Sequence, residues 1–267
     1  MPFPVTPGSV LELLLVLAVL LLTPVFLLRA RTGRLPVFRD LPGIALIRTR
    51  AASLAESGAA LHLATGANQA GGDTLTPTAE TLASALIAQR VAQETTGHGG
   101  NIVATTGDIT AHLALRGTIR DAYRQAGFAD DYRGETIQLV AQNAPAAYAA
   151  GVAARYRIAP VAAGVVAGNY GAEALLITEE GAAQGVPQVA AATSLSALPV
   201  LAISADATLI GEELFAAESY LTDDSRPKAR LLTHDALRWL VVALIVIGVI
   251  WQLLALMSPG LGLPGLS

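Results

Sequence analysis

Three segments of the chain contain residues that could bind a ligand or act on one. The first reads TGANQAGGD and contributes Thr65, Gly66, Asn68, Gly71, Gly72 and Asp73. Its glycines leave backbone N–H groups accessible, and such groups can hold an anion. Gly66 and Gly71 have P-loop spacing, but Gly72 stands where that motif requires lysine, so the segment is not a Walker motif. The alternative is a long surface loop without a ligand.

The second segment contributes Thr105, Thr106, Gly107 and Asp108. The simplest role for Asp108 is to be the N-cap of the helix that follows. His112 follows four residues later, and an Asp–His pair at this spacing could perform acid–base chemistry if both side chains faced a cleft. The alternative, which we favour, is a half-buried structural histidine on the helix face of Leu115 and Ile119.

The third segment contributes Gly168, Asn169, Tyr170 and Glu173. Asn169 and Tyr170 offer hydrogen-bond donors and a stacking surface. A simple turn explains the same residues equally well.

Familiar catalytic and metal-binding motifs are absent from the sequence. There is no GxSxG, HExxH, GxxxxGK[ST] or intact GxGxxG pattern. The chain has no cysteine, which excludes thiolate metal sites and a cysteine nucleophile. Its four histidines are not spaced as metal ligands. We therefore predict no metal site, and the sequence implies no particular cofactor.

The elements that must position these segments alternate between short apolar runs and amphipathic ones. The predicted strands are 43–47, 60–65, 101–105, 136–141, 162–167, 174–178, 188–192 and 200–204. The predicted helices are 51–57, 77–95, 109–126, 143–156 and 207–221, with Thr76, Asp108, Asn143 and Asp206 as N-caps and Gly58 ending the first. This alternation predicts a three-layer, Rossmann-like α/β domain with a mostly parallel sheet. Residues 168–191 are also compatible with a hairpin or short helices. In such folds ligands bind beyond the carboxyl ends of the strands, where the three segments would lie.

One predicted helix has a face of small residues, made of Ala146, Ala147, Ala150, Gly151 and Ala154. Such a face permits close helix contact. We expect it to dock on the sheet, because apolar faces are ordinarily buried. Self-association through this face is the alternative.

The composition argues against an ordinary cytosolic enzyme. Of the 267 residues, 53% are hydrophobic and only 14% are charged, against about 25% in soluble domains. The apolar runs 9–28 and 237–257 are each long enough to cross a hydrocarbon core of roughly 30 Å. The first run could instead be a cleaved signal peptide, but residues 1–8 carry no positive charge, so we expect a retained span.

Charge is segregated along the chain, although its net value is only −4. Residues 40–225 carry −10, and the flanking sequence carries +6. The flanking charges form two basic collars, which contain Arg29, Arg31, Arg34, Arg226, Lys228, Arg230 and Arg238. Because basic residues stay on the cytoplasmic side, we expect both collars and the domain between them in the cytoplasm. The collars would contact anionic lipid, or would serve only to set topology.

The expected organisation follows from the spans and collars. Residues 1–8 and 258–267 would lie outside, basic linkers would occupy 29–42 and 223–236, and the α/β domain would occupy 43–222. The acidic balance argues against nucleic acid as a partner. The expected partners are the lipid bilayer, a small-molecule ligand, and a second copy of the chain or a membrane-protein partner.

Several runs resemble an uncharacterised bacterial membrane-protein family that is labelled only as a domain of unknown function. They are Gly71-Gly72 with TAET at 78–81, VATTGD at 103–108 and IGEELFAA at 210–217. The resemblance covers about residues 35–250. It implies two terminal spans around one domain in the bacterial inner membrane, and it implies no reaction or cofactor.

These observations favour a non-catalytic, membrane-anchored cytoplasmic module. It would bind a small ligand or a partner at the three segments and would self-associate. The alternative is a hydrolase or transferase acting on a phosphorylated or nucleotide-like substrate. Asp73, Asp108, Glu173 and Glu212 would then supply acid–base groups or hold Mg²⁺, which requires that they converge on one cleft.

Overall fold

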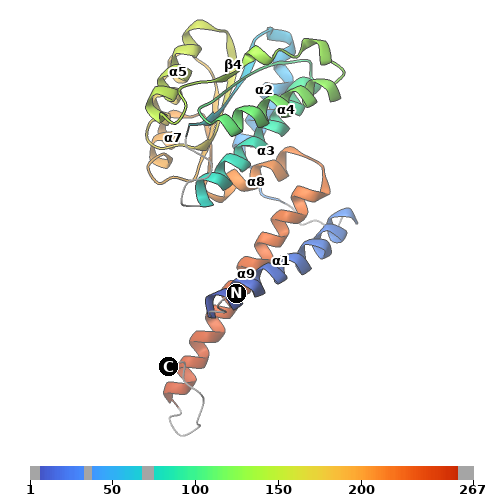
Figure 1. Ribbon diagram of the computed structural model, residues 1–267, viewed down its shortest axis with the longest axis vertical. Coiled ribbons are helices and arrows are strands. Elements are labelled where there is room, and N and C mark those ends of the chain that lie inside the picture. Colours follow the sequence, from blue (N-terminus) through green and yellow to red (C-terminus); the bar gives the residue numbers. More distant parts are fainter. Residues whose placement is uncertain (1–6, 33–37, 68–74, 258–267) are drawn as a thin grey trace, which may run out of the picture. The chain divides into compact units, whose positions relative to one another are not determined.

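The computed structural model describes residues 7–32, 38–67 and 75–257. The chain divides into two compact units (Figure 1): the described residues of 38–223 form one, and those of 1–37 and 224–267 form the other. The second unit consists of helices α1 (Pro7–Arg31) and α9 (Ser225–Met257), which pack against each other. Both are long and apolar enough to cross a membrane, and large side chains such as Leu20 and Ile245 are exposed along them.

A six-stranded sheet forms the centre of the other unit. Its strands are β1 Ala60–Gly66, β2 Asn101–Thr106, β3 Ile137–Leu139, β4 Val161–Asn169, β5 Gln188–Ala192 and β6 Ala207–Ile210. All of them are parallel, in the order β3-β2-β1-β4-β5-β6. Strands β2 and β3 therefore lie on one side of β1, and β4, β5 and β6 follow on its other side. The predicted α/β fold with a parallel sheet is confirmed.

The helices cover both faces of this sheet. They are α2 Pro42–Ser57, α3 Leu75–Gly97, α4 Ile109–Gln125, α5 Pro145–Ile158, α6 Ala174–Ala183, α7 Leu198–Ser204 and α8 Glu212–Leu221, with 3₁₀ turns at Ala129–Asp131 and Gly134–Thr136. Alternate residues of β1 face opposite layers, as a strand requires. Leu61 and Leu63 pack with α2, α3, α4 and α8, whereas Ala64 packs with α5, α6 and α7.

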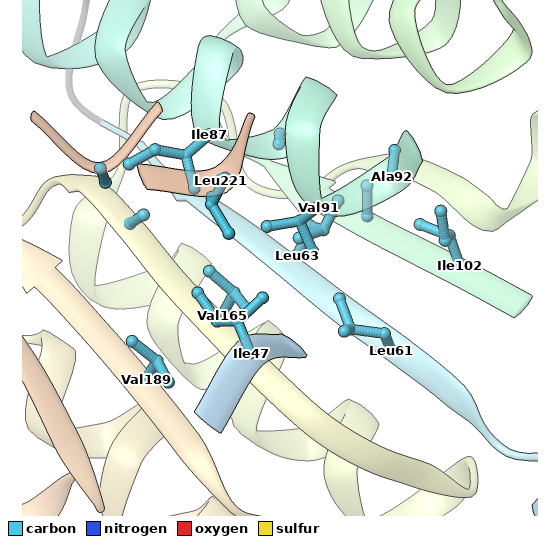
Figure 2. Packing of buried hydrophobic residues seen from close by; sticks show 14 of the residues in the cluster. Ile47, Leu61, Leu63, Ile87, Val91, Ala92, Ile102, Val165, Val189 and Leu221 are labelled. Carbon is cyan, nitrogen blue, oxygen red and sulfur yellow. The ribbon is translucent and has the colours of Figure 1, made fainter. Parts of the chain in front are cut away.

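Figure 2 shows the first of these cores at close range. Leu61, Val165 and Val189 of three strands meet Ile47 of α2 and Val91 of α3. Burying one aliphatic side chain of this size contributes about 1.5–3 kcal/mol, so this core anchors α2 and α3 firmly on the sheet.

The expected strand 43–47 is wrong, because these residues form the beginning of α2. Pro42 lies in the first turn, where its missing N–H costs nothing. Ile44, Ile47 and Leu54 recur at helical spacing and are buried on one face. The helix then ends at Gly58, which has a left-handed φ of 66° and was correctly expected to close it.

The expected strands 174–178 and 200–204 are also wrong, since they belong to α6 and α7; at 174–178 the alternative of a short helix is confirmed. Short apolar runs do not distinguish a strand from a buried helix. The expected helix 207–221 divides in two: Ala207–Ile210 pairs with β5 as β6, and Gly211, with φ 59°, separates it from α8. Asp206 does not cap a helix; its carboxylate accepts a hydrogen bond of 2.7 Å from the backbone N–H of Gln188.

Helix α5 differs from expectation at its start and on its faces. It begins at Pro145 after Ala144, while Asn143 has a φ of 55° and is not the cap. Its buried face carries Tyr148, Val152 and Tyr156. Ala146, Ala147, Ala150 and Ala154 are exposed. The prediction that the small-residue face docks on the sheet is therefore wrong, because the larger tyrosines occupy that side.

Candidate functional site

The three predicted segments meet at the carboxyl edge of the sheet, because β1, β2 and β4 are neighbours. Gly66 at the end of β1 pairs with Asn169 at the end of β4. On its other side, the carbonyl of Gly66 accepts a hydrogen bond of 2.8 Å from the N–H of Gly107. This is also the place where the strand order reverses, which is where doubly wound sheets bind ligands. Asn68, Gly71, Gly72 and Asp73 lie outside the described residues.

The glycines at this edge permit close backbone approach. A Cβ on Gly66 would lie 2.7 Å from the Asn169 carbonyl oxygen, and one on Gly168 would lie 2.4 Å from that of Thr65. Both glycines also have positive φ, 85° and 149°. The N–H of Gly66 is 3.3 Å from the Tyr148 hydroxyl, so it is used within the fold, as is that of Gly107. The expectation that Gly66 offers a free N–H to an anion is therefore wrong.

Asp108 is an N-cap, as the sequence predicts. Its carboxylate accepts a hydrogen bond of 2.7 Å from the N–H of Ala111 in the first turn of α4. Thr105 and Thr106 before it are buried. His112 is half-buried, and in the described part of the chain its Nδ1 has no hydrogen-bond partner. Burial, with a smaller contribution from Arg116, lowers the pKa of His112. The preferred interpretation of a half-buried histidine is therefore confirmed.

The residues of the third segment lie partly in the core and partly in a turn. Tyr170 is 1% exposed, so it offers no stacking surface, and this expectation is wrong. Its hydroxyl lies 3.4 Å from that of Tyr148. Glu173 accepts a hydrogen bond of 2.8 Å from the N–H of Gly171, which closes a turn. Asn169 is half-buried at the end of β4.

A buried polar network that sequence reasoning missed lies beneath this edge. His62 of β1 is fully buried, with Nδ1 3.0 Å from the Tyr156 hydroxyl and Nε2 2.9 Å from Thr105 Oγ1. The Tyr148 hydroxyl continues the network by donating to the Thr105 carbonyl at 3.1 Å. One signal was present in the sequence: Tyr148 and Tyr156 lie eight residues apart, on one helix face.

The network suits a neutral histidine. A neutral imidazole has one donor and one acceptor nitrogen and satisfies both hydroxyl partners, whereas an imidazolium has two donors. Burial, with a smaller contribution from Arg155, lowers the pKa of His62 to about 3. Burial also raises the pKa values of Tyr148, Tyr156 and Tyr170. His62 therefore stays uncharged at neutral pH and links β1, β2 and α5 as a structural group.

Glu80 of α3 is a second buried polar residue that sequence reasoning missed. It is 3% exposed, and its carboxylate accepts a hydrogen bond from the Thr193 hydroxyl directly after β5. Burial raises the pKa of Glu80, and a hydrogen bond from the backbone N–H of Thr193 opposes that effect. Glu80 lies in the TAET run noted above, but its spacing alone gave no reason to expect a contact with β5.

Residues 6–259 match the family described as "Domain of unknown function (DUF6754)". The chain belongs to this family. The match includes both apolar helices and the whole α/β unit. No curated protein and no solved structure matches the chain.

In this DUF6754 chain the carboxylates named for an enzyme are not gathered into one group. Asp108, Glu173 and Glu212 follow β2, β4 and β6, which are not neighbouring strands. Across residues 7–32, 38–67 and 75–257, no group of three or more His, Asp or Glu side chains could hold a metal ion. Asp73 lies outside the described residues. These three carboxylates therefore do not form a metal-binding group within the described residues.

Proposed function

We propose that this chain is a membrane-anchored α/β module that binds a small, nucleotide-like ligand at the carboxyl edge of its sheet. One observation carries the proposal: the ends of β1, β2 and β4 meet where the strand order reverses. Doubly wound sheets with this order bind nucleotides at that crevice. Binding without catalysis is the simpler role, because the chain lacks familiar catalytic motifs and its described carboxylates are dispersed.

A titration of the full-length protein in lipid nanodiscs tests this proposal. ADP, AMP and NAD⁺ are the probes, with inorganic phosphate as the control, and thermal unfolding is the measurement. A ligand at one hundred times its Kd stabilises the folded state by about 2.7 kcal/mol. We expect saturable stabilisation by at least one nucleotide. The absence of a shift with all three nucleotides would refute the proposal.

The membrane part of the proposal concerns anchoring and orientation. Support comes from two apolar helices and from basic residues at the ends of these helices that adjoin the α/β unit in sequence. We infer two spans in the bacterial inner membrane, with both chain ends outside and residues 38–223 in the cytoplasm.

Because the sequence contains no cysteine, single introduced cysteines can report this orientation. Ser57 is exposed at the end of α2, and Ser267 is the last residue of the chain. We expect a membrane-impermeant maleimide to label Ser267→Cys in intact spheroplasts, and to label Ser57→Cys only after lysis. The reverse pattern would overturn the orientation.

We also propose that copies of the chain associate through a groove between α5 and α6. The groove has a volume of about 580 Å³, and Ala150, Ala154, Leu175 and Leu176 are among its lining residues. The small alanines leave a hollow, and the exposed leucines beside them project from the same face. A two-fold interface needs such a self-complementary surface. Ala154→Arg should convert the associated protein to a monomer in light scattering, whereas Ala114→Arg on the exposed side of α4 should not.

A further inference from the structure

The buried acids of the α/β unit differ in the partners that offset the cost of burying a carboxylate. Three described carboxylic acids are 6% exposed or less: Glu80, Asp108 and Glu218. Glu218 forms an ion pair of 3.1 Å with Arg90, and Asp108 caps α4. Glu80 instead has neutral partners, the hydroxyl and backbone N–H of Thr193, and no ion pair within the described residues.

Neighbouring contacts place Glu80 at the carboxyl edge. Ser84, one turn further along α3, lies against Gly168, where a Cβ would be 3.5 Å from the Ser84 Cβ. Residues four apart share a helix face, so Glu80 lies one turn nearer the start of α3 on that face. Its partner Thr193 directly follows β5. The carboxylate therefore lies beside the half-buried Thr193 at the end of β5, on the helix face whose next turn packs against the end of β4.

A buried carboxylate without a cation is costly for a fold. Its desolvation is offset only by hydrogen-bond donors, and the hydroxyl and backbone N–H of Thr193 supply two donors to two oxygens that together accept about four. Packing does not require an acid here, since glutamine has almost the same shape and can also accept from Thr193. Groups of this kind in a crevice are candidates for ligand contact.

We propose that Glu80, oriented by Thr193, accepts hydrogen bonds from vicinal hydroxyls of the ligand, as a ribose would present them. This inference rests on the proposed function, because it assigns a ligand contact at the same edge of the sheet. A carboxylate oxygen can accept from each of two adjacent hydroxyls. A site built to bond a hydroxyl also rejects the analogue that lacks it, because its own polar group is then left unpaired.

The test compares ADP with 2′,3′-dideoxy-ADP on the full-length protein in nanodiscs. We expect the unmodified chain to bind ADP at least tenfold more tightly. In Glu80→Gln this preference should fall below twofold, while the melting temperature rises by several degrees because a buried charge is removed. Asp121→Asn, an exposed acid on α4, is the matched control and should change neither quantity. Thr193→Val should reduce the preference several-fold while retaining the acid, so it provides a second variant if Glu80→Gln does not fold.

The outcomes separate this inference from the proposed function. If the protein binds ADP and dideoxy-ADP equally, or if Glu80→Gln keeps the preference, the Glu80 assignment is wrong and nucleotide binding stands. If Glu80→Gln lowers the melting temperature and leaves binding unchanged, Glu80 is structural and the inference is overturned. If neither nucleotide binds, the assignment and the proposed nucleotide function both fail.

Discussion

Acidification should destabilise the α/β unit through His62. The side chain is buried and neutral in the fold, with its pKa lowered from 6.5 to about 3. The unfolded chain therefore takes up a proton at a higher pH than the folded chain does. The stabilising contribution of neutral His62 is fully present above pH 6.5 and is lost as the pH falls from 6.5 towards 3.

The size of the effect follows from this shift. One pH unit corresponds to about 1.4 kcal/mol while only the unfolded state binds the proton. Between pH 6.5 and pH 5, His62 should therefore cost about 2 kcal/mol of unfolding free energy. Other titrating groups, such as Glu80 and His112, contribute as well, so the comparison is made with His62→Gln, which retains those groups and cannot titrate at position 62.

The aromatic residues provide a selective assay. All six tyrosines lie within residues 38–223, and both tryptophans, Trp239 and Trp251, lie in α9. Tryptophan also absorbs near 280 nm, so both proteins carry Trp239→Phe and Trp251→Phe. Urea unfolding in detergent, followed by tyrosine circular dichroism near 280 nm, then reports on the α/β unit. The protein that retains His62 should lose about 2 kcal/mol more than His62→Gln between pH 6.5 and pH 5. Equal losses in the two proteins would refute a buried, neutral histidine.

Two further predictions concern the ends of the strands. Asp108→Ala should lower the unfolding free energy by about 1 kcal/mol, because α4 loses its N-cap. The control Asp121→Ala, on the exposed side of α4, should change it by less than about 0.5 kcal/mol. Equal effects of the two substitutions in urea titrations would argue against the cap. Gly66→Ala should cost more than about 1 kcal/mol, because its φ is 85° and its Cβ would meet the Asn169 carbonyl at 2.7 Å. As a control, Gly117 in the interior of α4 has open space around an added Cβ, so Gly117→Ala should raise the unfolding free energy by roughly 0.5–1 kcal/mol. If Gly66→Ala also raised it, the close approach of β1 and β4 would be contradicted.

The fold was largely accessible from the sequence because its signals are local. The strand 188–192 was predicted to the residue, and Asp108 and Gly58 were correctly predicted as helix boundaries. Errors arose where a short apolar run was considered without its neighbours. The run 43–47 is ambiguous by itself, and only the continuing period through Leu54 identifies a helix.

The site was only partly accessible, because its contacts join distant parts of the chain. The sequence pointed to the ends of 60–65, 101–105 and 162–167, but it could not give the strand order that places the first of these strands between the other two. His62 and Tyr156 are 94 residues apart, and Glu80 and Thr193 are 113 residues apart. No local pattern reports such partners. The same limit explains why Tyr170 was expected at the surface when its hydroxyl packs against Tyr148 in the core.

Hydrogen exchange of the full-length protein in nanodiscs, with and without ADP, can locate a ligand on the α/β unit. We propose that a small ligand binds where β1, β2 and β4 end. The account predicts that ADP slows amide exchange in peptides covering 62–67, 104–111 and 165–173, at the carboxyl edge. Exchange in 57–60, 98–102 and 158–162, at the opposite edge, should stay unchanged. Protection confined to the opposite edge, or no protection at saturating ADP, would contradict the account.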